Sequence, residues 1–522
     1  MKKLPIDLQS FETIRENGYL YIDKTRHIHR MIDQGTFYFL SRPRRFGKSL
    51  LFSILKNFFL GKKELFNGLW IAEHGNWDWK EYPILSIDFN VLDHDTEQNF
   101  KIALERNLIT TATRYGIHLE EPLLKSRFCE LILAMRRKTG MPVVILIDEY
   151  DKPIIDHLGK GDDALEIARA NRDILKNLLG VLKGEDVAPA LGFVFITGVS
   201  KFSRVSVFSD LNNLIDITMS EPYADMLGYT QDEFETCFKE YILKFAEKNR
   251  LTEKQVLEKF RIQYNGYRFS ERDIKVYNPF SVLRAFFNLK LKNYWFETGT
   301  PTFLVNLLKK NQYDLPRIEG MQVSEQIFSV YELDNLEPEA LLFQTGYVTI
   351  KDVKGRLYTL DYPNIEVKTS FLEFLLFSFS KANSRQGASK FLLLSEYLKS
   401  ENFDDFFETI TSIFGSIPYT LNTQRDEAYF HTIFYLMVSA SGADAKSEVL
   451  TARGRIDLVV EFHDKIFIIE FKCNQSADKA IKQIHDKGYA EKYKQTGKKL
   501  FLIGVNFSSE KRNVAEWSKV DF

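Results

Sequence analysis

Two sets of residues in this sequence have types and spacings that suit phosphate chemistry. The first is the basic loop Arg42-Pro-Arg-Arg-Phe-Gly-Lys-Ser49, which matches G-x-x-x-x-G-K-[ST] except that Arg42 replaces the first glycine. In such a loop Gly47 lets the backbone approach the phosphates, Lys48 reaches the β and γ oxygens, and Ser49 can bind Mg²⁺. A basic surface loop without a ligand is the simpler alternative for this incomplete match.

An apolar run at 143–147 ends in two adjacent acids, Asp148 and Glu149. A buried strand would place Asp148 at the carboxyl edge of a sheet, where it can hold Mg²⁺, and Glu149 could orient the attacking water. Thr197 ends the next apolar run and could contact the γ-phosphate, with a plain strand-end residue as the equal alternative. Together these features predict a site for ATP and Mg²⁺ formed by Arg45, Phe46, Gly47, Lys48, Ser49, Leu50, Asp148 and Thr197.

The second set lies near the end of the chain, where Asp457 precedes Glu470-Phe-Lys472. If two strands turn at His463-Asp464, Asp457 lies directly opposite Glu470, and Arg455 lies opposite Lys472 on the same face. Opposed Cβ atoms are about 4.5–5.5 Å apart, so both carboxylates could reach one cation. The other face would carry an apolar surface made of Ile456, Leu458, Val460, Phe467, Ile469 and Phe471. A structural salt-bridge cluster is the alternative to a metal site.

Positioning these residues requires more than one folded domain. Apolar runs at 37–40, 83–89, 142–148 and 191–197, separated by helical segments, predict a parallel sheet covered on both faces. Residues 219–290 have a mainly helical pattern, and the following stretch adds a small β element around 346–350 and 356–360. After residue 406, a helical stretch leads to strands at 456–462, 466–471 and 500–505, which indicates a second α/β domain.

The composition is that of a folded protein without a strong global charge. The 522 residues are 44% hydrophobic and carry a net charge of -1, so any contact with nucleic acid must be local. Three separated cysteines fit a reducing compartment. No apolar stretch reaches the roughly 18 residues of a membrane span, and the first residues lack the apolar core of a signal peptide. We therefore expect a cytoplasmic protein that does not associate with membranes.

Four motifs resemble the bacterial AAA-ATPase-like family over roughly residues 1–290. They are Tyr21-Ile-Asp-Lys-Thr25, the basic loop through Leu50, Ile147-Asp-Glu-Tyr-Asp-Lys-Pro153 and Tyr264-Asn-Gly-Tyr-Arg-Phe269. Members of that family carry the same basic loop, so Arg42 in place of glycine looks like a family trait. The resemblance implies ATP binding by Lys48 and Ser49 and acid roles for Asp148 and Glu149. It does not supply an arginine finger, for which Arg204 is a candidate and a surface arginine the alternative.

Residues 410–510 resemble the PD-(D/E)xK nuclease superfamily. The resemblance implies Asp457 and Glu470 as metal ligands, Lys472 as the catalytic lysine and Gln483 as an accessory residue. An acid from a preceding helix often completes such sites; Glu427 and Glu448 both qualify, and we favour Glu448. The helix of Gln483 also carries Lys479, Lys482 and Lys487, which form either a track for a phosphate backbone or an ordinary solvated face.

We therefore predict an α/β protein with four parts. These are a P-loop AAA-like ATPase core at 1–215, a helical lid or linker at 216–290, a mixed helical and β middle region at 291–405, and a PD-(D/E)xK nuclease-like domain at 406–522. The expected catalytic residues are Glu149, Asp457, Glu470, Lys472 and Gln483. The expected metal ligands are Ser49, Asp148, Glu448, Asp457 and Glu470.

The predicted function is an ATPase coupled to a Mg²⁺-dependent nuclease that acts on DNA or RNA, with a homo-oligomer as an option. One alternative is an ATP-driven switch whose nuclease-like domain binds nucleic acid or a partner without cutting. Another is a signalling ATPase whose C-terminal domain serves only assembly.

Overall fold

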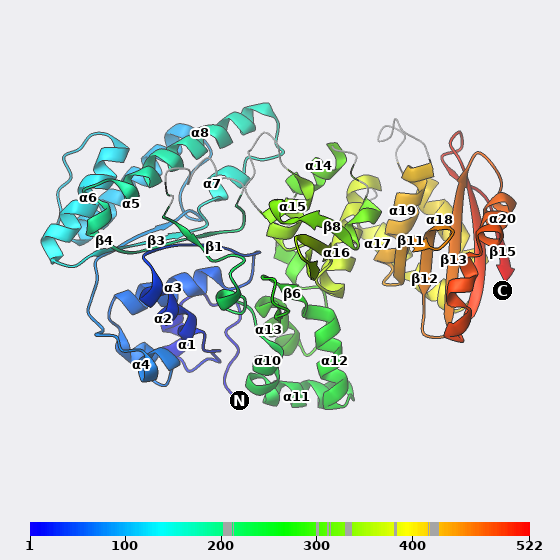
Figure 1. Ribbon diagram of the computed structural model, residues 1–522, viewed down its shortest axis with the longest axis horizontal. Coiled ribbons are helices and arrows are strands. Elements are labelled where there is room, and N and C mark those ends of the chain that lie inside the picture. The colour runs from blue at the N-terminus through cyan, green and yellow to red at the C-terminus, as the bar shows by residue number, and fades with distance from the viewer. Residues whose placement is uncertain are drawn as a thin grey trace. The chain divides into compact units, whose positions relative to one another are not determined.

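In a computed structural model, the chain forms two compact units (Figure 1). The first comprises residues 1–308 and 322–364, and the second comprises residues 309–321 and 365–522. The structure describes residues 1–201, 211, 213–298, 302–310, 313, 315–328, 337–380, 384–415, 417 and 427–522.

A five-stranded parallel sheet organises the N-terminal unit. Its order is β2-β3-β4-β1-β5, with bounds β1 Phe37–Ser41, β2 Ile84–Asp88, β3 Val143–Asp148, β4 Leu191–Gly198 and β5 Ile215–Asp216. The predicted parallel sheet is confirmed, and β5 is an additional edge strand of two residues. All residues of β1 and β3 are buried, because helices cover both faces of the sheet (Figure 1).

Helices α5, α6 and α8 cover one face of this sheet, and α1–α4 lie on the other (Figure 1). Their bounds are α1 Phe11–Glu16, α2 Thr25–Gln34, α3 Lys48–Phe59, α4 Trp70–His74, α5 Glu97–Arg114, α6 Leu124–Thr139, α7 Lys152–Ile155 and α8 Asp162–Leu179. Helix α3 begins at the basic loop, directly after β1, so the predicted order of strand, loop and helix is confirmed.

A helical cluster with its own aromatic core follows the sheet in the chain. Thr230 and Thr252 each form a capping box, which fixes the starts of α10 and α12. Inside the cluster, Phe286 stacks on both Phe234 and Phe260, whose rings are tilted toward each other. The bounds are α10 Gln231–Cys237, α11 Lys239–Asn249, α12 Glu253–Tyr264, α13 Pro279–Asn288, α14 Thr302–Lys310 and α15 Pro338–Thr345, with strands β6 Tyr267–Arg268, β7 Lys275–Val276, β8 Met321–Ser324, β9 Thr349–Lys354 and β10 Leu357–Asp361.

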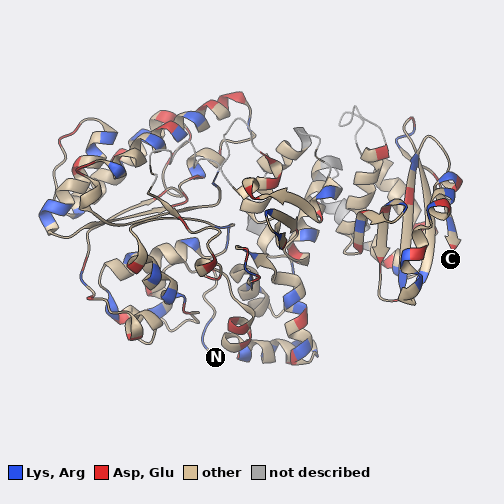
Figure 2. Cartoon of the chain, viewed as in Figure 1, with Lys and Arg blue, Asp and Glu red and all other residues tan. Residues whose placement is uncertain are grey.

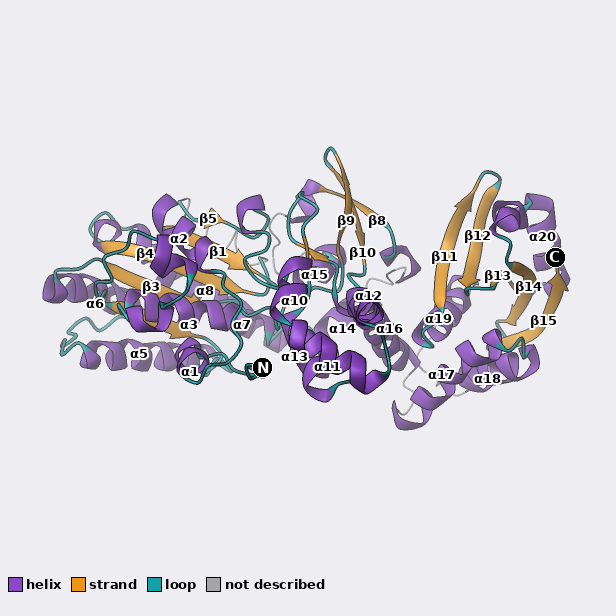
Figure 3. Ribbon diagram, turned by 90° about the horizontal axis from the view of Figure 1, so that it is seen from below, coloured by secondary structure: helices purple, strands orange, loops and turns teal. Residues whose placement is uncertain are grey.

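The C-terminal unit contains a second five-stranded sheet, of order β11-β12-β13-β14-β15. Only β13 and β14 run parallel, and helix α20 connects them. Helix α18 packs on one face through Phe403 and Phe467, and α20 packs on the other through Ile481 and Ile484 (Figure 3). The bounds are α16 Ile365–Ser380, α17 Ser384–Lys399, α18 Phe403–Gly415, α19 Glu427–Ala440, α20 Ala477–Lys487, β11 Asp444–Thr451, β12 Gly454–Glu461, β13 Lys465–Cys473, β14 Lys499–Ser508 and β15 Asn513–Asp521.

The predicted hairpin register is confirmed for the four pairs next to the turn, whereas the expected pairs Asp457–Glu470 and Arg455–Lys472 are not part of the ladder between β12 and β13. Leu458 faces Ile469 and Glu461 faces Ile466, with the turn at His463-Asp464. The expected apolar face is correct except at Ile456, which packs instead with Ile468 and the residues of α20. Strands β11 and β15 were not predicted, because both are polar edge strands whose side chains remain partly exposed.

No helix within the described ranges is long and apolar enough to cross a membrane. Basic and acidic residues are interspersed along the chain of each unit (Figure 2).

Candidate functional sites

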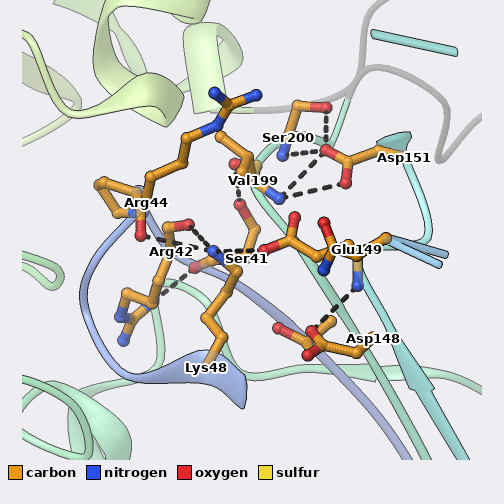
Figure 4. A network of polar contacts seen from close by, with 12 residues as sticks. Ser41, Arg42, Arg44, Lys48, Asp148, Glu149, Asp151, Val199 and Ser200 are labelled. Atoms are coloured by element: carbon orange, nitrogen blue, oxygen red, sulfur yellow. Dashed lines mark hydrogen bonds and ion pairs between the residues drawn. The ribbon is translucent and has the colours of Figure 1, made fainter. Parts of the chain in front are cut away.

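The basic loop ends at a glycine whose backbone conformation suits phosphate binding. Gly47 adopts a left-handed conformation with φ of 96°, which a side chain would oppose, and α3 begins at the next residue. The Lys48 ammonium lies 3.2 Å from the carbonyl oxygen of Arg42 and 3.4 Å from Oε1 of Glu149 (Figure 4). The N-terminus of α3 and the Lys48 ammonium therefore direct positive charge to one place, as an anionic ligand requires.

Asp148 and Glu149 reach this loop from the end of β3, although β4 lies between β3 and β1. Asp148 is 2% exposed and accepts a hydrogen bond from the backbone N–H of Glu149. Burial and the charge of Glu149 raise the pKa of Asp148 to about 6, against a hydrogen bond from Ser49 that lowers it. The structure thus brings Ser49 and Asp148, the two predicted Mg²⁺ ligands, into contact. A hard cation on these oxygens would offset the cost of burying the Asp148 charge.

Arg42 does not contact this anion site through its side chain. The guanidinium is 1% exposed, donates to the carbonyl oxygens of Ser41 and Thr218, and lies 4.2 Å from the ring centre of Phe269. Arginine at the position of the first glycine is therefore an anchor that ties the start of the loop to the chain around Thr218 and to β6 with its flanking Phe269.

Arg44, Arg45 and Phe46 are held by a group of aromatic side chains that we call the collar. Phe46 is 1% exposed, so only its backbone could contact a ligand, whereas the Arg45 side chain is exposed. Leu50 lies half-buried in the first turn of α3. The collar consists of Tyr267 and Phe269 against the Phe46 ring, Phe280 beneath the Arg45 guanidinium, and Trp295, whose indole N–H donates to the Arg44 carbonyl.

Thr197 is buried at the end of β4, and its hydroxyl donates to the carbonyl oxygen of Leu40 at 2.7 Å. This bond ties β4 to β1 and uses the hydroxyl hydrogen. Arg204, the candidate arginine finger, lies outside the described residues.

The second site lies on β12 and β13 of the C-terminal unit. Glu470 is 1% exposed; its Oε1 accepts from the amide of Gln483 and lies 3.4 Å from the Lys472 ammonium. Asp457 accepts a 2.8 Å hydrogen bond from the backbone N–H of Phe471, next to Glu470. The structure therefore brings together Asp457, Glu470, Lys472 and Gln483, as predicted from the hairpin register and the family resemblance.

The two carboxyl groups are electrostatically strained. Burial raises the pKa of Glu470, and the charge of Asp457 raises it further; burial also raises the pKa of Asp457. The Oε2 atom of Glu470 is buried and accepts no hydrogen bond from the described residues. Mg²⁺ commonly takes one or two protein carboxylates and completes its shell with water and phosphate, so this pair fits such a cation.

Comparison with known proteins supports the two-part architecture. A family model described as "Predicted AAA-ATPase" matches residues 5–208, and one described as "PD-(D/E)XK nuclease superfamily" matches residues 425–517. An "Uncharacterized protein in vnfD 5'region" of Azotobacter chroococcum mcd 1 is 38% identical over 527 residues, covering 98% of each chain. This chain belongs to the AAA-ATPase-like family. It carries a PD-(D/E)XK nuclease superfamily domain at its C-terminal end. No solved structure matches it.

The sequence predicts that Glu448 lies on a helix before the nuclease-type site. In this AAA-ATPase-like protein that prediction is wrong. Glu448 lies on β11, where its carboxylate pairs with Arg455 and lies 3.6 Å from Nδ1 of His431. Glu427, the other candidate, is the first residue of α19. Within the described part of the chain, no three His, Cys, Asp or Glu side chains are grouped to hold a metal ion. A metal role for Glu448 stays a prediction.

Sequence reasoning missed Asp151 in the AAA-ATPase-like domain. Its buried carboxylate accepts from the backbone N–H groups of Val199 and Ser200 and from the Ser200 hydroxyl (Figure 4). A Cβ atom at Gly198 would lie 2.4 Å from Asp151 Oδ1, so glycine is needed there. The third acid in Ile147-Asp-Glu-Tyr-Asp151 was the available signal, but its partners lie about 50 residues away in sequence.

Proposed function

We propose that this protein is an ATP-dependent or ATP-regulated nuclease that hydrolyses phosphodiester bonds of DNA or RNA with Mg²⁺. The observation that carries the proposal is the convergence of four polar side chains at one place on the C-terminal sheet: Asp457, Glu470, Lys472 and Gln483. Two buried carboxylates beside one lysine suit a cation and a phosphate better than they suit a structural salt bridge, because one carboxylate oxygen lacks a hydrogen-bond donor.

The side chains of the C-terminal site have distinct proposed roles. Asp457 and Glu470 would hold Mg²⁺, which supplies an activated water and stabilises charge on the phosphate. Lys472 donates to Glu470 and to the carbonyl oxygen of Phe471. These contacts hold its ammonium beside the carboxylates, where it would neutralise negative charge. Gln483 fixes the orientation of Glu470 by a hydrogen bond from its amide nitrogen.

The N-terminal site is proposed to bind and hydrolyse ATP. Lys48 and the N-terminus of α3 would bind the phosphates, and Ser49 with Asp148 would hold the accompanying Mg²⁺. Glu149, already within 3.4 Å of Lys48, would orient the attacking water. The exposed lysines of α20, namely Lys479, Lys482 and Lys487, support contact with a nucleic-acid backbone in the C-terminal unit.

The nuclease proposal is tested by incubating the full chain with plasmid, single-stranded DNA and RNA, with Mg²⁺ or EDTA and with or without ATP. Glu470→Gln keeps the size of the side chain and removes its charge. We expect the cleavage rate to fall on the order of 100-fold or more, because the metal would lose a charged ligand.

Glu510→Gln is the matched control, because Glu510 is exposed on the turn after β14. It should cut at the wild-type rate. If the wild type cuts none of these substrates under any of the conditions, the nuclease proposal fails. The alternative, an ATP-driven switch that binds nucleic acid or a partner without cutting, is then favoured.

A further inference from the structure

Tyr489 lies against the C-terminal site without belonging to any motif found in the sequence. It directly follows Gly488, whose left-handed conformation ends α20 and turns the chain back toward the sheet. The ring is 2% exposed and packs in one cluster with Ile456 and Ile484. A phenol in this position must find hydrogen-bond partners, because an unpaired buried hydroxyl is costly.

The first partner of the phenol is the backbone before Asp457. The Tyr489 hydroxyl donates to the carbonyl oxygen of Arg455 at 2.8 Å. A Cβ atom at Gly454 would lie 2.9 Å from the same hydroxyl, and Gly454 has a φ of 156°. Glycine at the start of β12 therefore leaves room for the phenol, which fixes the strand two residues before Asp457.

The second partner is Gln483. Burial raises the pKa of Tyr489; a hydrogen bond from Gln483 lowers it, and the nearby charges of Glu470 and Asp457 raise it. The phenol donates to the carbonyl oxygen of Arg455 and lies beside the Gln483 amide. The Gln483 amide nitrogen donates to Glu470, so the phenol lies next to a residue that contacts a proposed metal ligand.

We propose that Tyr489 is a positioning residue of the C-terminal site, which fixes the amide orientation of Gln483 and the course of the strand carrying Asp457. The inference rests on the proposed nuclease function. It adds a residue outside the sequence motifs that holds β12 beside Gln483, the residue that donates to Glu470.

The test compares Tyr489→Phe with Tyr493→Phe. Both change one phenol to a phenyl ring in the same 3-10 helix, Tyr489–Thr496, and Tyr493 has no role in the proposed site. Removal of a residue that orients metal ligands commonly costs about 10–100-fold in activity or metal affinity. In Tyr489→Phe we expect kcat to fall at least about tenfold with KM for nucleic acid nearly unchanged, while Tyr493→Phe keeps wild-type values.

A second measurement does not depend on cleavage. Mg²⁺ affinity is measured by calorimetry without nucleotide, with Glu470→Gln as the blank for other sites, and should weaken at least about tenfold in Tyr489→Phe. Wild-type kcat and wild-type Mg²⁺ affinity in Tyr489→Phe would overturn the inference. If the wild type cuts nothing while Tyr489→Phe still weakens Mg²⁺ binding, the nuclease proposal fails and the positioning role stands. If Mg²⁺ binding is also unchanged, both fail.

Gly454→Ala provides an independent check on the contact. It should lower kcat and Mg²⁺ affinity by pushing the phenol away, and the loss should be smaller in a Tyr489→Phe background, where no hydroxyl is present to clash. Equal losses in the two backgrounds would contradict the contact.

Discussion

At the scale of single residues, Asp151 shows how a buried carboxylate organises the N-terminal site. Three donors from Val199 and Ser200 converge on it, which fixes the chain where it leaves β4 beside the phosphate loop. Burial and the charge of Glu149 nonetheless raise the pKa of Asp151 to about 6. The residue therefore shapes the site at a cost in stability that depends on pH.

The sign of this dependence follows from proton binding. Between pH 4 and 6 the folded chain holds a proton on Asp151 that the unfolded chain has released, so the free energy of unfolding falls as pH rises through this window. The rise from 3.8 to about 6 corresponds to at most about 3 kcal/mol. The unfolding midpoint of the wild type minus that of Asp151→Asn should therefore be larger at pH 4.5 than at pH 7.5. A gap that does not change with pH would contradict this assignment.

At the scale of elements, the collar explains how a loop rich in arginine can replace one rich in glycine. This loop packs outward through Arg42 and Phe46 onto β6 and its neighbours, contacts that glycine side chains could not make. Gly346 approaches Pro43 so closely that a Cβ atom would lie 2.7 Å from it. The helical cluster and the β9–β10 region are thus part of what shapes the phosphate site.

Phe46→Ala should destabilise the N-terminal unit by about 3–5 kcal/mol, as expected for truncating a buried phenylalanine. It should also weaken ATP binding, because the loop loses its contact with Tyr267 and Phe269. Both effects can be measured by thermal unfolding with and without MgATP. Phe287→Ala is the control, since Phe287 is 64% exposed on α13 and should change neither quantity. Wild-type stability and ATP affinity in Phe46→Ala would show that the collar does not support the loop.

At the scale of the whole molecule, the chain joins two units that each contain a candidate site for phosphate chemistry. The N-terminal sheet presents Lys48, Asp148 and Glu149, and the C-terminal sheet presents Asp457 and Glu470. Their presence in one chain is the reason to expect that nucleotide binding at the first site changes activity at the second.

Lys48→Ala tests this coupling. ATP turnover should fall on the order of 100-fold, because the ammonium that stabilises the transferred phosphate is lost. If ATP changes the rate of nucleic-acid cleavage in the wild type, this variant should no longer respond to ATP. Lys63→Ala, an exposed lysine after α3, should behave as the wild type. ATP turnover that persists in Lys48→Ala would contradict the assignment of the phosphate loop.

The sequence by itself determined the features that depend on neighbours along the chain. The buried strands β1–β4 are visible as apolar runs, and α3 is visible in its spacing. The hairpin register followed from the position of the turn, because a two-residue loop leaves one pairing of the strands that flank it. The proximity of the Asp457 and Glu470 carboxyl groups was predictable for this reason, although the ladder itself ends one pair earlier, at Leu458 and Ile469.

Only the tertiary structure decided which distant residues meet. Arg42 is an anchor because Thr218 and Phe269 pack on it, Glu448 pairs with Arg455 because β11 is an edge strand, and Tyr489 reaches Arg455 because α20 ends at Gly488. These contacts join segments 7–227 residues apart, across turns whose geometry local spacing does not specify. A sequence pattern records the period of one element, whereas the packing of several elements selects the partner of each side chain.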